Sequence, residues 1–505
     1  MSSPAYGGGD IRGLSNPLIS TMNSRISSSL TSRNVAVIGA GAAGLVAARE
    51  LRREGHKTVV FERSNQIGGT WVYDPNIESD DPLGLNPSRN IIHTSLYKNL
   101  RTNLPRESMG FRDYPFVTKD GNDQRDNRRY PGHKEVLNYL EDFANDFKLI
   151  ELIRFETEVF HVGLLKDDDK DGKKWVVRSA QKMRGGAGDG EAVDEVFDGV
   201  VVCNGHYTEP NIAEIPGHLT VGRREYQICK DDILRGIDEW PGKQMHSHNY
   251  RVPEPFLDQV VVVIGTSASG QDISRDIAEA AKEVHIAGRS LTEGVPTRLP
   301  GHENMWLHSM IESAHDDGRV IFQDGSSVTA DVILHCTGYK YHFPFLETNN
   351  IVIVDENRVG PLYKHVFPPL LAPGLSFIGL PWKVIPFPLS ELQSKWVAGV
   401  LSGRISLPSQ EEMMADVEAF YLELEAAGLP KRFTHNMSDY QFEYGDWLAA
   451  QCGCTHSEKW RKLMYYEASK KKRSQPETYR DEWEAEHLIL EAYEYFRQCI
   501  PTSVR

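Results

Sequence analysis

The chain has 505 residues, enough for two large domains or about three of average size. Hydrophobic residues make up 40% and charged residues 25%, so a large core can form and disorder of the whole chain is excluded. The formal net charge is −15, and a diffuse negative charge repels phosphate backbones, which argues against a nucleic-acid partner.

Residues 1–32 differ in composition from the rest of the chain. They are rich in serine, include Arg12 and Arg25, and have Asp10 as their single acidic residue. They lack the apolar segment of a secretory signal, so we expect a disordered N-terminal tail and a cytoplasmic protein. An organelle transit peptide, and with it a plastid location, is the alternative.

Cysteine spacing and hydropathy exclude two further classes. The six cysteines show no framework of a small secreted domain, so we expect reduced thiols and neither a disulfide nor a metal site. No stretch approaches the roughly 18 apolar residues of a membrane span.

A strand–turn–helix–strand pattern occupies residues 34–63. A short β-branched run precedes Gly39-x-Gly41-x-x-Gly44, an apolar-periodic helix and a second apolar strand that ends in Glu62. Gly39 permits the tight turn, Gly41 lets the backbone approach a pyrophosphate, and Gly44 lets helix and strand pack closely. An acid at Glu62 can bond ribose hydroxyls, so the pattern predicts a dinucleotide site at the helix N-terminus.

The middle of the chain changes character. Residues 155–203 read as antiparallel strands joined by charged or Gly-rich turns. The Pro-rich segments 210–217 and 250–256 are typical of hinges between domains.

A second strand–turn–helix–strand pattern follows at 259–289. It has Gly265-x-Ser267-x-x-Gly270, in which a small serine replaces the middle glycine and still allows close approach. Its second strand is followed by Arg289 instead of ending in an acid. A guanidinium at this position suits a 2′-phosphate, so NADPH is favoured over NADH.

The remaining chain completes the predicted architecture. The strand 330–339 is expected to return the chain to the first domain, and helices are predicted over 389–403, 409–427 and much of the C-terminal part. We therefore predict an α/β fold with two Rossmann-like dinucleotide-binding domains, the smaller inserted into the larger.

Two nucleotide sites in one chain indicate electron transfer from a pyridine nucleotide to a flavin. Four further motifs then resemble the flavin-containing monooxygenases, a family of class B flavoprotein monooxygenases, over about residues 33–450. They are the flavin-contacting turn IGGTWVYDP (67–75, with Gly69 and Trp71), Trp240-x-Gly242-x-x-x-His246-x-x-x-Tyr250, the linker HCTGY (335–339), and IGLPW with SELQSKWVAGVLSG (378–403). The second of these motifs normally starts with phenylalanine, where this chain has Trp240.

The resemblance implies cofactors and domain boundaries. FAD would bind a discontinuous domain of residues 33–209 and 335–505, and NADPH a domain of residues 210–334. Asn103 would be the catalytic contact to the reduced flavin and the nicotinamide. His246 lies in a linker motif, which favours a structural role over acid–base catalysis.

The resemblance also implies a reaction. Reduced FAD and dioxygen would form a flavin 4a-hydroperoxide, which a soft nucleophile attacks without an activated protein group. Among family members the chain most resembles the plant glucosinolate S-oxygenases. We therefore expect a small sulfide substrate, such as a methylthioalkyl glucosinolate, that is oxidised to its sulfoxide, here a methylsulfinylalkyl glucosinolate.

Several alternatives stay open at this point. An N-hydroxylating or Baeyer–Villiger monooxygenase would use the same intermediate. A flavin disulfide reductase is disfavoured because residues 62–110 contain no cysteine. A non-catalytic flavin-binding redox sensor predicts decay of one nucleotide site, whereas both Gly-rich turns are intact. A homodimer is left open.

Overall fold

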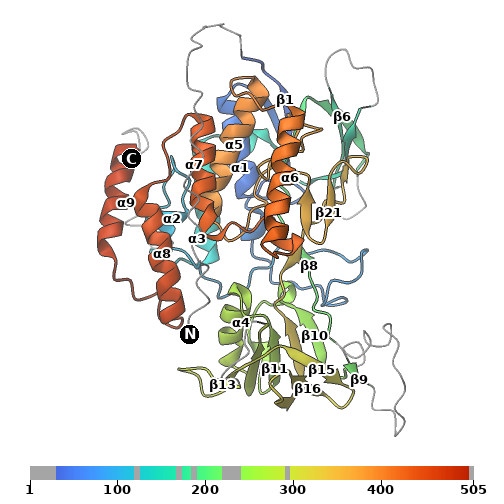
Figure 1. The fold of residues 1–505 in the computed structure, drawn as a ribbon, viewed down its shortest axis with the longest axis vertical. Helices are drawn as coiled ribbons and strands as arrows, with labels where there is room; N and C mark the ends of the chain where they lie inside the picture. Colours follow the sequence, from blue (N-terminus) through green and yellow to red (C-terminus); the bar gives the residue numbers. More distant parts are fainter. Residues whose placement is uncertain are drawn as a thin grey trace.

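The computed structural model describes residues 30–118, 125–165, 173–182, 190–215, 217–218, 240–289 and 296–499. The predicted tail 1–32 lies outside these ranges except for its last residues, and so does Cys229. Figure 1 shows a larger lobe with most of the helices and a smaller lobe that contains α4, β11 and β15.

A five-stranded sheet of order β23-β7-β1-β2-β3 forms the centre of the larger lobe, and every pairing in it is parallel. Continuous apolar runs such as VAVI suit strands that are covered on both faces. The strands are β1 (Asn34–Ile38), β2 (Lys57–Phe61), β3 (Ile153–Arg154), β7 (Gly199–Val202) and β23 (Leu375–Phe377).

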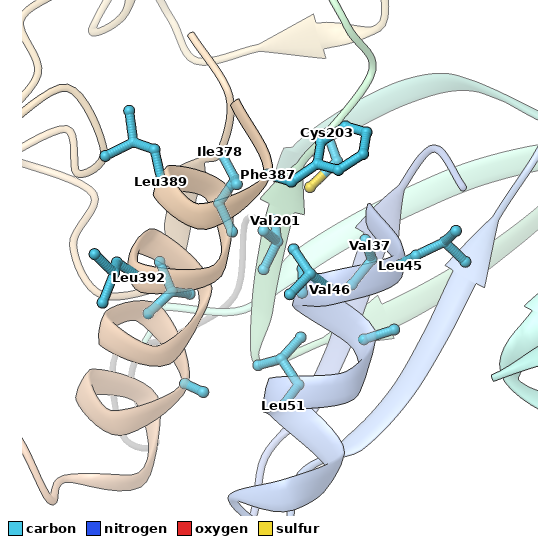
Figure 2. Close-up of a cluster of buried hydrophobic side chains, with 14 of the residues drawn as sticks. Val37, Leu45, Val46, Leu51, Val201, Cys203, Ile378, Phe387, Leu389 and Leu392 are labelled. Carbon is cyan, nitrogen blue, oxygen red and sulfur yellow. The ribbon is translucent and has the colours of Figure 1, made fainter. Parts of the chain in front are cut away.

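Helices cover one face of this sheet. Helix α1 (Ala42–Arg53) packs between the sheet and α5 (Pro386–Ser402), as Figure 2 shows, with Val46 and Phe387 in the shared core. Helices α2 (Arg106–Met109) and α3 (His133–Asp146) lie in the same lobe. Their apolar residues belong to the same buried cluster.

A mixed sheet, with one parallel and two antiparallel pairings, covers the other face, through Trp175 and Phe197. Its order is β20-β4-β5-β6, with β20 (Leu346–Glu347), β4 (Thr157–Leu164), β5 (Trp175–Gln181) and β6 (Val193–Phe197). The prediction of antiparallel strands over 155–203 is correct for β4 to β6 and wrong for β7. Residues 199–202 are buried on both faces, which suits the centre of the parallel sheet, whereas β6 is largely exposed.

The smaller lobe is built on a six-stranded sheet of order β10-β18-β11-β12-β14-β13, parallel except at β13. Helix α4 (Ala268–Ala278) packs against it. The strands are β10 (Lys243–His246), β11 (Val260–Ile264), β12 (Glu283–Ala287), β13 (Thr297–Arg298), β14 (Met305–His308) and β18 (Val332–His335). A second sheet of order β17-β16-β15-β9 joins β9 (Gly217–His218), β15 (Ile311–His315), β16 (Arg319–Phe322) and β17 (Ser327–Thr329).

The strand predicted to return the chain to the first domain remains in the smaller lobe. Strand β18 pairs with both β10 and β11, because its four buried residues suit the centre of a parallel sheet. The return comes directly after it, at β19 (Tyr339–Lys340), which pairs with β8 (Glu209–Pro210). The two passages of the chain between lobes therefore lie side by side.

The C-terminal part is helical, as predicted. The predicted helices 389–403 and 409–427 are confirmed as α5 and α6 (Gln410–Ala426), and Ser409 with Glu412 forms a capping box at the start of α6. A hairpin of strands β21 (Ile353–Asp355) and β22 (Arg358–Gly360) precedes them, and α7 (Gln441–Cys452), α8 (Lys459–Ser474) and α9 (Glu486–Cys499) follow.

Candidate active site

The first Gly-rich turn leaves no room for side chains at two of its glycines. Gly39 has φ of +101°, and a Cβ there would lie 2.7 Å from the carbonyl oxygen of Cys203. A Cβ on Gly44 would lie 1.8 Å from the carbonyl oxygen of Gly39. The turn and the close packing of helix on strand therefore both require glycine.

The start of α1 is suited to an anion. Gly41 is its N-cap, without a side-chain cap, and the first turn contains no acidic residue, so the helix dipole and first-turn amides are not offset by a carboxylate. Residues 67–71 close on this helix start: Gly68 N donates to Ala40 O at 3.0 Å, and a Cβ on Gly69 would lie 3.0 Å from Gly41 Cα. The two backbones meet without intervening side chains; we call this helix start the first cradle, because free first-turn amides of this kind bind a pyrophosphate.

Glu62 lies beside this cradle and is only 7% exposed. Its Oε2 accepts from Ala40 N at 2.8 Å, and its Oε1 accepts from the backbone N and the hydroxyl of Ser64 at 2.9 and 2.8 Å. Each carboxylate oxygen has two lone pairs, so Oε1 is already saturated, whereas Oε2 can hold the turn and still accept from a ribose hydroxyl.

The second Gly-rich turn repeats the first. Gly265 has φ of +116°, and a Cβ there would lie 2.5 Å from the carbonyl oxygen of Cys336. A Cβ on Gly270 would lie 1.9 Å from the carbonyl oxygen of Gly265. Ser267 is the exposed N-cap of α4, whose first turn also contains no acidic residue. Arg289 is exposed just beyond the end of β12, where a 2′-phosphate can reach it.

The cysteines beside the two turns are not a redox pair. Cys203 follows β7 and Cys336 follows β18, and both are free and buried. Burial raises the pKa of the Cys336 thiol to about 12 and raises the pKa of Cys203 as well. Thiols of this kind are poor nucleophiles, which argues against disulfide exchange.

An aromatic wall stands next to the 67–71 turn. Trp71 meets Phe387 edge to face at 6.3 Å between ring centroids, and Phe387 stacks on Tyr139 at 6.0 Å with 6° between the ring planes. Phe387 lies in the first turn of α5, so this helix brings the wall to the cradle. Such a wall can shield a flat ring system from water.

Asn103 is exposed and lies on a segment between the two lobes. On one side, Asn99 Nδ2 donates to Asp276 Oδ1 of α4 at 2.8 Å. On the other side, the segment continues into α2 and to Phe111, which stacks on Phe387 at 5.3 Å. These contacts are made by the neighbours of Asn103, and they place it at the boundary of the lobes.

The motif 240–250 forms a buried seam. Gly242 is required because a Cβ there would lie 2.1 Å from the Trp240 ring. His246 is fully buried, and its Nδ1 accepts from His248 N at 3.0 Å. Burial, with the nearby His248 and His335, lowers the pKa of His246 to about 3, so this ring is neutral. These contacts agree with the structural role favoured for His246.

The residues present therefore fit two dinucleotides: two backbone cradles at helix starts, an acid beside one and a guanidinium beside the other. Among residues in the described ranges, no group of three or more His, Cys, Asp or Glu side chains is arranged to hold a metal ion. In the same ranges, no helix has the length and apolar character needed to cross a membrane.

Comparison with known proteins decides the family. The flavin-binding monooxygenase-like family model matches residues 32–295 and 294–455. The chain belongs to this family. It is accordingly an NADPH-dependent flavoprotein monooxygenase that uses FAD and NADPH.

Individual relatives support the assignment over nearly the whole length. Flavin-containing monooxygenase FMO GS-OX-like 4 of Arabidopsis thaliana is 57% identical over 470 residues, which are 93% of this chain and 98% of that protein. The structure of S-allyl-L-cysteine S-oxygenase from Allium sativum is 60% identical, with a TM-score of 0.85 over 93% of this chain and 100% of that one. Tmm from Pelagibacter sp. strain HTCC7211 is 26% identical, with a TM-score of 0.70 over 89% of this chain and 93% of that one.

Two sets of residues around the site were missed by sequence reasoning. In the first, Arg251 donates to the carbonyl oxygens of Asp74 and His248, each at 2.7 Å, and so ties the seam to the loop after Trp71. In the second, Arg480 reaches the Asn103 segment from the C-terminal part. The sequence gives no local signal for either, since each contact joins residues far apart in the chain.

Proposed function

We propose that this monooxygenase transfers one oxygen atom from dioxygen to the sulfur of a thioether and forms a sulfoxide. The observation that carries the proposal is the likeness to the Allium S-oxygenase across almost the entire chain. The overall reaction balances as thioether, O₂, NADPH and H⁺ giving sulfoxide, NADP⁺ and water.

The site residues have separable roles in this proposal. Gly39, Gly41, Gly44 and Gly69 admit the FAD pyrophosphate, and Glu62 binds its ribose. Gly265, Ser267 and Gly270 admit the NADPH pyrophosphate, and Arg289 pairs with the 2′-phosphate.

Bound FAD, once reduced, supplies the oxygen-transfer chemistry. The chain's own contribution is to orient the reactants and exclude water. Trp71 and the Phe387 wall shield the flavin side, and the Asn103 amide, which can both donate and accept, holds the nicotinamide side.

We propose methylthioalkyl glucosinolates as substrates, converted to methylsulfinylalkyl glucosinolates. The GS-OX names of several Arabidopsis relatives support this choice. The name of the Allium protein, S-allyl-L-cysteine S-oxygenase, supports S-substituted cysteines as a second class of sulfide substrate. N-hydroxylation and Baeyer–Villiger oxidation are the alternatives within the same chemistry, and a non-catalytic redox sensor is the alternative outside it.

A substrate panel tests the proposal. The purified protein with FAD would be given NADPH in air with a methylthioalkyl glucosinolate, an S-alkyl cysteine, a tertiary amine or a cyclic ketone. We expect sulfoxide with close to one NADPH used per product, and little amine oxide or lactone. Preferred turnover of the amine or ketone would replace sulfur with one of the alternatives, and no product from any of them would favour the sensor.

Three further parts of the proposal concern organisation. We assign FAD to residues 33–209 with 335–505 and NADPH to residues 210–334. A homodimer and a cytoplasmic location, with the plastid as the alternative if residues 1–32 direct import, also remain proposals. Light scattering on the purified protein and imaging of the tagged full chain test them.

A further inference from the structure

Residues 475–483, which are most of the loop between α8 and α9, lie at the boundary of the two lobes; we call them the clasp loop. Figure 1 shows the lower end of α8 at the level of α4. The match to the family model ends at residue 455, so the clasp loop lies beyond the part of the chain that the model covers.

The clasp loop holds α4 through two ion pairs. The Arg480 guanidinium donates to Asp272 Oδ2, and Glu477 Oε1 accepts from Arg275 Nε at 2.7 Å. Glu477 Oε2 also pairs with His302 Nε2 at 3.0 Å. Asp272 and Arg275 are three residues apart and therefore lie on one face of α4, the helix whose N-terminus forms the second cradle.

The same loop holds the segment that leads to Asn103. Arg480 Nε donates to the carbonyl oxygen of Thr102 at 3.0 Å, and Thr102 immediately precedes Asn103. Arg101 forms an ion pair with Asp481 at 2.8 Å. One guanidinium thus bridges the backbone next to Asn103 and the carboxylate of Asp272 in α4.

The bridge is anchored and mostly out of water. Tyr479 is only 1% exposed and meets Tyr130 edge to face at 5.5 Å between ring centroids. The side chains of Arg480 and Asp272 are 18% and 16% exposed. Since removing one partner leaves the other charge poorly solvated, this pair should matter more than an ion pair at the surface.

We propose that Arg480 is a positioning residue that fixes Asn103 relative to α4. The nicotinamide of an NADPH bound at the start of α4 would then approach the flavin in a single geometry. The proposal rests on the proposed function for the place of Asn103 in the reaction. Arg480 touches neither cradle, and it acts through the Thr102 carbonyl and Asp272. Replacing Arg480 should therefore increase the mobility of residues 99–106 and uncouple NADPH oxidation from sulfoxide formation.

Three variants test the proposal. R480M removes the charge and keeps the length of the side chain, whereas R480K keeps the charge but cannot hold both acceptors in a fork. K471M is the control. Lys471 lies in α8, the helix that leads into the clasp loop, and it pairs with the exposed Glu484 at 3.0 Å, away from both cradles. Hydrogen–deuterium exchange of the protein without cofactors would be measured beside the KM for NADPH and the sulfoxide formed per NADPH.

We expect exchange at residues 99–106 to be about tenfold faster in R480M and unchanged in K471M. Sulfoxide per NADPH should fall at least about threefold in R480M, with the missing electrons recovered as hydrogen peroxide. R480K should be as stable as the wild type yet keep a coupling defect. In a double-mutant cycle, D272N should add little to R480M because both break one bridge.

Two outcomes would overturn the proposal: wild-type exchange and coupling in R480M, or equal losses in R480M and K471M. Failure of the proposed function has a different signature. In that case the wild type makes no sulfoxide, while R480M still speeds exchange at residues 99–106.

Discussion

The two Gly-rich turns share a plan and differ in how open they are. In both, the first glycine faces a cysteine carbonyl and the third faces the first. The first turn is half-buried and is closed by residues 67–71, whereas Ser267, Ala268 and Ser269 of the second turn are exposed. A closed cradle favours a cofactor that is retained through turnover, and an open one favours a cofactor that exchanges.

The largest expected effects come from filling the third glycine of each turn. In G44A and G270A the new Cβ would lie 1.8 and 1.9 Å from a carbonyl oxygen, so the helix must shift. We expect G44A to lose most of its bound FAD, and G270A to keep FAD but to lose reduction by NADPH at least about 100-fold.

Absorbance of the desalted protein and anaerobic reduction kinetics check this pair. G132A is the matched control at a helix start, because a Cβ there meets nothing closer than 3.6 Å. Loss of FAD from G270A with retention in G44A would reverse the assignment of the two turns.

Arg289 should show the next largest effect. Replacing its guanidinium in R289Q removes a charge-assisted hydrogen bond to the 2′-phosphate, worth about 1.5–3 kcal/mol. We expect the KM for NADPH to rise about 10- to 100-fold and the KM for NADH to stay the same. Steady-state kinetics with both nucleotides measure the change. An equal rise of the KM for NADH would mean that R289Q disturbs the fold of the domain and does not act through a contact with the 2′-phosphate.

The two turns were predictable from sequence because their chemistry depends on spacing within about 30 residues of chain. The direction of β7 was not, because Asp198-Gly199 is typical of a tight turn between antiparallel strands, whereas here it separates the exposed β6 from the buried, parallel β7. The role of Arg480 was also not predictable from the sequence. It lies 208 residues from Asp272 in sequence, and a charged loop near a C-terminus is typical of a solvated surface.

Acid should weaken both lobes. The pKa of buried His246 is lowered to about 3, and that of buried His365 in the larger lobe also to about 3. Between these values and about 6.5 the unfolded chain binds protons that the folded chain does not, so the free energy of unfolding falls as pH falls. For His246 the loss at pH 5 is on the order of 2 kcal/mol.

Denaturant titrations at pH 7 and pH 5 measure this loss. H246N keeps an acceptor for His248 N and cannot titrate, so its stability should depend less steeply on pH than that of the wild type. An unchanged slope would assign the acid sensitivity to other groups.

Ser267 should show the smallest effect. Its side chain is exposed and makes no capping hydrogen bond, so S267G changes little at the open cradle. We expect the KM for NADPH to change by less than about threefold, because a small residue already permits close approach. A tenfold change would mean that the Ser267 hydroxyl contacts the nucleotide directly.

Isotope labelling tests the central claim most directly. The purified protein with FAD and NADPH would convert a methylthioalkyl glucosinolate under ¹⁸O₂, and mass spectrometry would follow the sulfoxide. The account predicts one ¹⁸O atom in each sulfoxide, with close to one NADPH oxidised per product. Unlabelled sulfoxide, or NADPH oxidation that yields only hydrogen peroxide with every sulfide, would contradict it.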